Sequence, residues 1–193
     1  MHLPILLCCL ALAVWAPVHA ANPPAEVAGV RLAERVRVAG QHLVLNGAGL
    51  RQFLFMKVYV AALYLPERHH DAHAILDGDM PRGLWLTLLR DISAEQNVEV
   101  LKVGLIDNNG PEVMHAIQAD VERFLGYIRS LREVSAGTEI HLDYLVGVGT
   151  RVSVNGRLLG TVPGEAFNRA LLRIWLGDAP VQANLKQALL GES

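Results

Sequence analysis

The stretch FLFMKVYVAALYL, Phe53–Leu65, decides the fold of this chain. It is rich in aromatic and β-branched residues and carries a single charge, at Lys57. Such a run is typical of a central strand that is buried on both faces for much of its length. Pro66 ends it, because proline cannot donate the next hydrogen bond of a β-ladder. The sequence therefore predicts a sheet with this strand near its middle.

Other strand signals lie on both sides of this stretch. Upstream, Arg31–Val38 and His42–Leu45 flank a turn that contains Gly40, and a glycine-rich break follows at Asn46–Gly49. Downstream, Gly83–Arg90 is a second apolar strand. Further strands are expected at 138–148, 151–154 and 157–162, the last two joined by Asn155-Gly156, a strong β-hairpin signal.

Helical periodicity appears in two blocks between and after these strands. A short helix is expected from the cap Asp71, and another from the capping box that starts at Ser93. Gly110-Pro111 opens a longer helix with an apolar stripe from Val113 to Leu131. Two more helices are expected at 163–176 and 183–190. The order contains hairpins and no βαβ alternation, so we predict an α+β fold with helices layered on one face of a large antiparallel sheet.

Composition limits the classes of function. The chain has 193 residues, of which 52% are hydrophobic, and a formal net charge of −2. One folded domain, over residues 30–193, accommodates this length and apolar content. The balance of charges gives no electrostatic reason to bind nucleic acid.

The first residues predict export. Residues 1–20 contain a short apolar run, Ile5–Ala16, and end in Val18-His19-Ala20, an A-x-A-like cleavage site, so we expect a signal peptide cut after Ala20. The alternative is a retained membrane anchor, because the run lacks a strongly positive start. Cleavage removes both cysteines, Cys8 and Cys9, and with them any thiol chemistry. A disordered lead over 21–29, a periplasmic or secreted location and no membrane span in the mature protein are then expected.

One cluster has metal-ligating residue types. His69, His70 and His73 are close in sequence, and His69 and His73 would share a face of a helix that began early enough. With Asp71 as the cap, His69 lies before the helix, so we interpret the cluster as a solvated loop. We expect no metal and no cofactor.

Three polar side chains lie beside apolar elements. Arg51 immediately precedes the apolar run, where a guanidinium can bind a carboxylate or a polarised carbonyl through two parallel hydrogen bonds. Tyr59 lies within that run and needs a hydrogen-bond partner if its hydroxyl is buried. Asp120 flanks the apolar stripe of the long helix. The alternative for each is an ordinary surface or core role.

Several motifs in this order resemble the chalcone isomerase superfamily, and in particular its bacterial exported members. The resemblance covers about Val30 to Gly191. The residues that carry it are LNGAGLR at 45–51, KVYVAALYL at 57–65, LRDIS at 89–93, GPE at 110–112, WLGD at 175–178, LK at 185–186 and LLG at 189–191.

The resemblance implies an open-faced β-sandwich and a candidate site. True chalcone isomerases close a flavanone ring while an arginine stabilises the developing enolate, and Arg51 matches that arginine. Other positions depart from the enzymes. Val113 stands at the catalytic tyrosine, Asp120 at an asparagine, Tyr59 at a threonine and Ile174-Trp175 at a substrate-lining Thr-Met pair. The lysine of the cleft has no counterpart near Gly104.

A second branch of the superfamily binds fatty acids without catalysis and pairs the arginine with a tyrosine, as Arg51 and Tyr59 would. The resemblance therefore implies a binding protein for a fatty acid or a similar apolar carboxylate, with Arg51, Tyr59, Asp120 and Trp175 in its cleft. One alternative is an isomerase, or intramolecular lyase, with Arg51 as electrophilic stabiliser and Tyr59 or Asp120 handling a proton. Another is a non-catalytic interaction module whose cleft is filled by Trp175, Phe55 or Tyr127.

Overall fold

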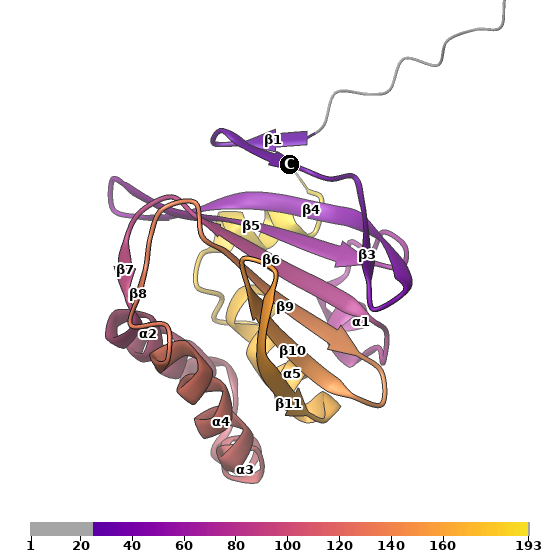
Figure 1. Ribbon diagram of the computed structural model, residues 1–193. Helices are drawn as coiled ribbons and strands as arrows, with labels where there is room; N and C mark the ends of the chain where they lie inside the picture. The colour runs from indigo at the N-terminus through magenta and orange to yellow at the C-terminus, as the bar shows by residue number, and fades with distance from the viewer. Residues whose placement is uncertain (1–24, 193) are drawn as a thin grey trace, which may run out of the picture.

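The computed structural model describes residues 25–192, and it confirms the predicted α+β architecture. Seven antiparallel strands form one curled sheet in the order β11-β10-β9-β6-β5-β4-β3 (Figure 1). The apolar run contributes β5, which lies between β6 and β4 near the middle of the sheet, as predicted. The strands of this sheet are β3 (Arg35–Val38), β4 (Gln41–Phe53), β5 (Met56–Leu65), β6 (Arg82–Leu88), β9 (Glu139–Leu145), β10 (Gly149–Val154) and β11 (Arg157–Pro163).

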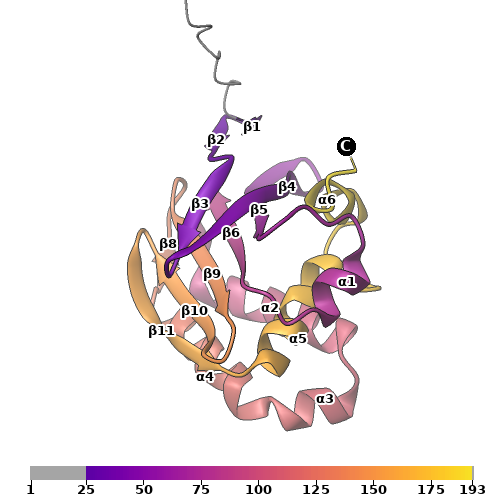
Figure 2. The ribbon, with the colours of Figure 1, turned by 90° about the vertical axis from the view of Figure 1, so that its right-hand side faces the viewer.

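The helices pack against one face of this sheet, and Figure 2 shows α1, α5 and α6 together on that side. Inward side chains of β5, β6, β9 and β10 form the main core with them, and α5 contributes most of its length to it. The helices are α1 (Ala72–Asp77), α2 (Ala94–Asn108), α3 (Pro111–Ala116), α4 (Gln118–Arg129), α5 (Glu165–Leu176) and α6 (Ala183–Leu189).

The opposite face of the sheet carries a second, smaller core. Val60, Ala62 and Tyr64 of β5 pack there with Leu43 and Leu45 of β4. A short hairpin of β1 (Ala25–Val27) and β2 (Val30–Leu32) contributes to this cluster. The part of the expected disordered lead that the structure describes, residues 25–29, is therefore ordered, because Val27 packs against this apolar cluster and β1 pairs with β2. The expected signal peptide, residues 1–20, lies outside the described residues.

The glycine-rich segment is not a break, which corrects the sequence interpretation. Strand β4 runs without interruption through it, with a β-bulge between Leu45 and Gly47. Its glycines serve close packing, since a Cβ atom on Gly47 would lie 2.1 Å from the carbonyl oxygen of Ala188 in α6. Glycine within a strand often marks a bulge or a close approach of another backbone, and both occur here.

Replacing Gly47 with alanine is therefore expected to destabilise the fold by roughly 1–3 kcal/mol, because α6 must shift to make room. Gly126→Ala is the matched control. It lies within α4, where a Cβ atom meets nothing within 4 Å, so its free energy of unfolding should stay unchanged or rise. Urea denaturation of both variants measures the difference. Equal unfolding midpoints would contradict the proposed close packing.

The stretch Phe53–Leu65 is also not one strand. Phe53 ends β4, Leu54 and Phe55 form a two-residue turn, and Met56 begins β5. The first four residues are exposed at the tip of this hairpin, and burial begins further along β5. Hydrophobic content alone does not distinguish an exposed tip from a buried strand.

Local signals at turns and caps predicted most boundaries correctly. Asn155 and Gly156 both have positive φ in the predicted hairpin turn. Asp71 accepts a hydrogen bond from His73 N, and Ser93 accepts one from Gln96 N, as expected of helix caps. The predicted long helix after Pro111 is instead two helices, because Ile117 leaves helical geometry between α3 and α4.

Among residues 25–192, no helix is both long and apolar enough to cross a membrane.

Candidate functional site

The bulge in β4 determines which face of the sheet Arg51 occupies. Before it, Leu43 and Leu45 pack in the outer cluster, whereas after it Gly47 and Gly49 lie against α6 on the helix-covered face. Side chains alternate along a strand, so Arg51 shares the helix-covered face with the two glycines. Its cross-strand partner in β5 is Tyr59, which packs against the main core. The two side chains named from the sequence are therefore neighbours on one face.

Tyr59 is held by Trp175 of α5. The indole Nε1–H donates to the hydroxyl oxygen of Tyr59 at 2.9 Å. That bond occupies the oxygen as an acceptor and leaves the phenolic O–H free to donate. Burial raises the pKa of Tyr59 to about 12, although the Trp175 hydrogen bond and the charge of Arg51 act in the opposite direction. Tyr59 is thus a neutral donor at physiological pH.

Arg51 is held by Gln182, in the segment between α5 and α6. Its Nη1 donates to the side-chain Oε1 of Gln182 at 3.2 Å and to the carbonyl oxygen of Gln52. Gln182 also accepts from Gln52 N at 2.9 Å and donates to Leu50 O at 3.3 Å, so it fastens this end of β4. The partners of Arg51 in the described residues are all neutral. Its guanidinium is therefore in no ion pair among these residues, and it faces a groove that Glu99 and Asp107 also line.

Two adjoining hollows surround these residues. An inner cavity of about 60 Å³ lies under α2, and apart from Tyr59, Asn97 and the Trp175 N–H its lining is aliphatic and aromatic. An open groove of about 420 Å³ lies beside it, lined by Arg51, by residues of α2 that include the carboxylates Glu99 and Asp107, and by the segment after α5. Val100 and Val181 line both hollows, so they form the boundary between them. A molecule with a polar head at Arg51 has an apolar surface next to it.

Helix α2 is the outer wall of this region and is weakly packed. Only Ala94, Val98 and Leu105 are buried among its 15 residues, while Val100 and Val103 are exposed toward the groove. A helix with few buried contacts is among the segments that open most easily.

Both the sequence and the fold of this chain are similar to those of known proteins. The family model described as chalcone isomerase-like matches residues 24–191. The chain belongs to the chalcone isomerase-like family. A fatty-acid binding protein of Arabidopsis thaliana has a similar fold, with a TM-score of 0.66, 14% sequence identity, and coverage of 84% of this chain and 92% of that chain. No curated protein sequence matches this one.

The chalcone isomerase-like fold brings three of the four candidate residues together. Arg51, Tyr59 and Trp175 line the two adjoining hollows. Asp120 does not reach them, since it lies near the start of α4 and pairs with Arg123 at 3.1 Å. Val113, at the position of the enzymes' catalytic tyrosine, is exposed on α3 and lines neither hollow.

Trp175, which the interaction-module hypothesis expected to fill the cleft, is buried and lines the inner cavity. Phe55 is exposed at the hairpin tip instead. Tyr127 packs near Gly160 and donates to Thr161 O at 3.4 Å. The space that remains in the inner cavity is small. Arg51, however, lines the open groove and forms no ion pair among the described residues.

The histidine cluster supports α6 and its flanking loop. His69 N donates to Asn46 Oδ1 at 2.7 Å, and His70 Nδ1 lies 2.6 Å from the carbonyl oxygen of Leu190. Within residues 25–192, no group of three or more histidine, cysteine, aspartate or glutamate side chains is arranged to hold a metal ion.

The raised pKa of Tyr59 predicts a specific pH dependence of stability. A tyrosine with a folded pKa of about 12 and an unfolded pKa of about 10 stabilises the fold fully below pH 10. That contribution is lost as the pH rises from about 10 to about 12. Urea unfolding at pH 8 and pH 11.5 should therefore show a smaller loss for Tyr59→Phe than for the wild type. Equal losses would contradict the buried, neutral hydroxyl.

Sequence reasoning missed Gln182 and the valines between the hollows. Gln182 lies 131 positions from Arg51, and only the folded chain shows that they meet. Val100 and Val181 carry no signal that separates a cavity wall from ordinary packing.

Proposed function

We propose that this protein binds a fatty acid, or a similar long-chain carboxylate, without catalysis, and that it does so after export to the periplasm or the medium. The observation that carries the proposal is the pairing of Arg51 and Tyr59 across β4 and β5, next to an apolar cavity. The name of the Arabidopsis relative, a fatty-acid binding protein of the same fold, supports it.

The carboxylate is placed where the groove meets the inner cavity. Arg51 offers a positive charge from the groove, and Tyr59 offers the O–H that its bond with Trp175 leaves free. Charge-assisted hydrogen bonds of this kind are about twice as strong as neutral ones. The two donors come from adjacent strands, which hold them in place before the ligand arrives.

The acyl chain is placed in the inner cavity, along Leu86, Leu101 and Ile140. Each buried CH₂ contributes about 0.8 kcal/mol. The present volume of about 60 Å³ is below the roughly 300 Å³ or more typical of ligand sites, so the cavity widens on binding. The weakly packed helix α2 is the wall that moves outward.

Binding is favoured over the isomerase alternative by the lining of the inner cavity. Its residues include no carboxylate and no imidazole, so the acidic group in this cavity is the Tyr59 phenol, while Glu99 and Asp107 line the open groove instead. A phenol with a pKa of about 12 is a poor general base at neutral pH, since an effective base titrates near the working pH.

Native mass spectrometry of the protein purified from cells tests the proposal. We expect a co-purifying long-chain carboxylate that denaturing extraction releases. Delipidated protein that takes up no palmitate in titration would overturn it. Turnover of chalcones or other enones above an Arg51→Met control would favour the isomerase instead.

A further inference from the structure

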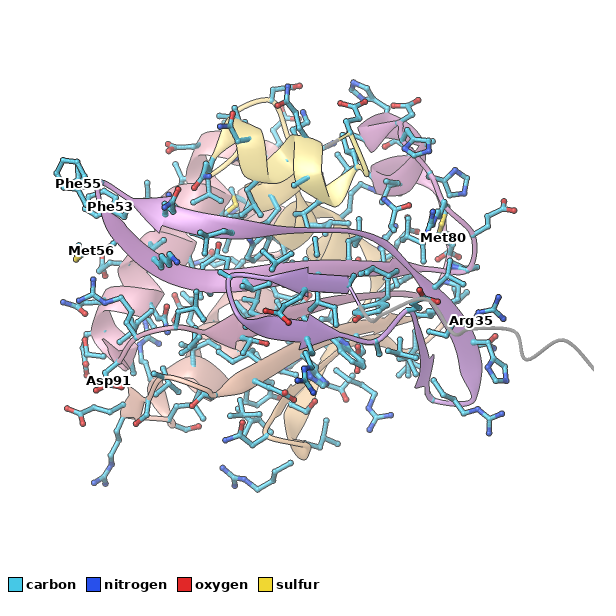
Figure 3. All side chains as sticks on the ribbon, turned by 90° about the horizontal axis from the view of Figure 1, so that it is seen from above. Arg35, Phe53, Phe55, Met56, Met80 and Asp91 are labelled. Atoms are coloured by element: carbon cyan, nitrogen blue, oxygen red, sulfur yellow. The ribbon has the colours of Figure 1, made fainter. Side chains whose placement is uncertain are left out.

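The tip of the β4–β5 hairpin exposes an unusual run of large apolar side chains. Phe53, Leu54, Phe55 and Met56 are consecutive, and Leu54 and Phe55 are 76% and 98% exposed. Figure 3 shows the labelled Phe53, Phe55 and Met56 at the extreme end of the molecule, away from the core. Exposed runs of this length are rare in folded proteins unless they contact something.

The backbone conformation of the turn does not favour these residue types. Leu54 has a φ of 53°, in the left-handed region that glycine and asparagine adopt far more readily. Tight hairpin turns normally contain such residues, whereas this one has Leu54 and Phe55. The apolar side chains are kept at some conformational cost, which is characteristic of functional positions.

We propose that this hairpin tip inserts into the surface of an anionic lipid bilayer. Successive side chains of a hairpin project in opposite directions, so the four apolar residues point to both sides of the tip. The flat surface of a protein partner would cover one side only, whereas a fluid bilayer surrounds a convex tip completely.

Two basic residues adjoin the tip. Lys57 follows the apolar run directly, and Arg90 reaches the tip through a contact between its Nη1 and the sulfur of Met56. The exposed Asp91 lies at the same end of the molecule, where its carboxylate accepts a hydrogen bond from Ala136 N at 2.8 Å. Basic residues beside an apolar anchor are attracted to anionic headgroups.

The same hairpin leads directly into the groove. Arg51 lines the groove two residues before Phe53, so insertion of the tip brings the groove close to the bilayer. An apolar ligand then moves between protein and membrane with little exposure to water. The membrane contact depends on the hairpin tip alone, and it does not require that the ligand be a fatty acid.

Vesicle flotation tests the proposal, with vesicles of phosphatidylcholine and phosphatidylglycerol in equal parts. We expect the wild type to float and Leu54→Ser/Phe55→Ser to lose about tenfold or more of its partitioning. Val146→Ser/Val148→Ser is the matched control, because these valines are also exposed but belong to the β9–β10 turn. A control that floats like the wild type supports the proposal.

A second measurement locates the inserted segment. Phe55→Trp should show a blue-shifted fluorescence spectrum with these vesicles and little change with pure phosphatidylcholine, whereas Val148→Trp should not respond. Wild type that does not float, or a tip variant that floats equally well, would overturn the proposal. Self-association through the tip, seen as a concentration-dependent sedimentation coefficient that Leu54→Ser/Phe55→Ser abolishes, would also overturn it.

Palmitate titration without vesicles separates this inference from the proposed function. The tip variant should bind palmitate as the wild type does, because neither serine replaces a residue that lines the groove or the cavity. Loss of vesicle binding with retained palmitate binding supports a separate docking surface. Vesicle binding by a protein that binds no palmitate would leave the docking surface established and overturn the ligand.

Discussion

Replacing Arg51 with methionine is expected to weaken palmitate binding roughly ten- to hundredfold. Methionine keeps much of the apolar stem but removes the charge that the groove offers to a carboxylate. Hydrogen bonds to a charged group contribute about 1.5–3 kcal/mol, which corresponds to this range of affinity. Isothermal titration of delipidated protein measures it directly.

Two further variants make this result specific. Tyr59→Phe should weaken binding less, because it removes one neutral donor and leaves the cavity lining intact. Arg157→Met, at the exposed first residue of β11, should bind as the wild type does. An Arg51→Met variant that folds normally and binds palmitate with unchanged affinity would show that the guanidinium does not hold the carboxylate.

Replacing Arg82 with methionine is expected to lower the free energy of unfolding by roughly 2–4 kcal/mol. Arg82, at the start of β6, is only 2% exposed. It donates to Asn168 Oδ1 at 2.7 Å and to the carbonyl oxygens of Ile75 and Gly78 at 2.5 and 2.9 Å. Methionine leaves these acceptors without their donor, and the junction of α1, α5 and the sheet loses its hydrogen bonds.

The loss of unfolding free energy in Arg82→Met has an upper limit, because the substitution also removes an unfavourable burial of charge. Arg82 Nη2 has no hydrogen-bond partner within residues 25–192, and burial lowers the pKa of the guanidinium, so the native state already carries a penalty. Urea denaturation compares Arg82→Met with Arg157→Met, because Arg157 is exposed at the start of β11. A loss below about 0.5 kcal/mol, typical of surface substitutions, would contradict a structural role for Arg82.

The overall architecture was predictable because it follows from local patterns. Asn155-Gly156 predicts a hairpin from its backbone preferences alone, and Asp71 and Ser93 predict helix starts from their side chains. The position of β5 near the middle of the sheet follows from its apolar composition.

Features that depend on distant contacts were not predictable from these patterns. Gly47 signals a break in sequence, but its role is to admit α6 against β4. Phe53 and Phe55 are of a residue type expected in the core, yet they are exposed at the tip of the β4–β5 hairpin. Arg82 is charged and would be expected at the surface, and only its three acceptors explain its burial.

The candidate site was predictable only in part, because local patterns identify some of its residues and distant contacts bring in the others. The resemblance of the motifs around Arg51 and Tyr59 to the family identified both residues, and strand pairing places them on one face. Asp120 lies beside the apolar stripe of its helix, as its spacing in sequence predicts, but it pairs with Arg123. The spacing of a helical stripe does not specify which residues lie next to its edge. Gln182 had no local signal at all.

The most direct test of the central claim is calorimetric titration of the delipidated wild-type protein with palmitate and with methyl palmitate. The two share an acyl chain, and only palmitate carries the charge that Arg51 and Tyr59 are proposed to bind. We predict that palmitate binds at least about tenfold more tightly than the ester, by the strength of a charge-assisted hydrogen bond. Equal affinities for the two, or no binding of palmitate, would contradict the account.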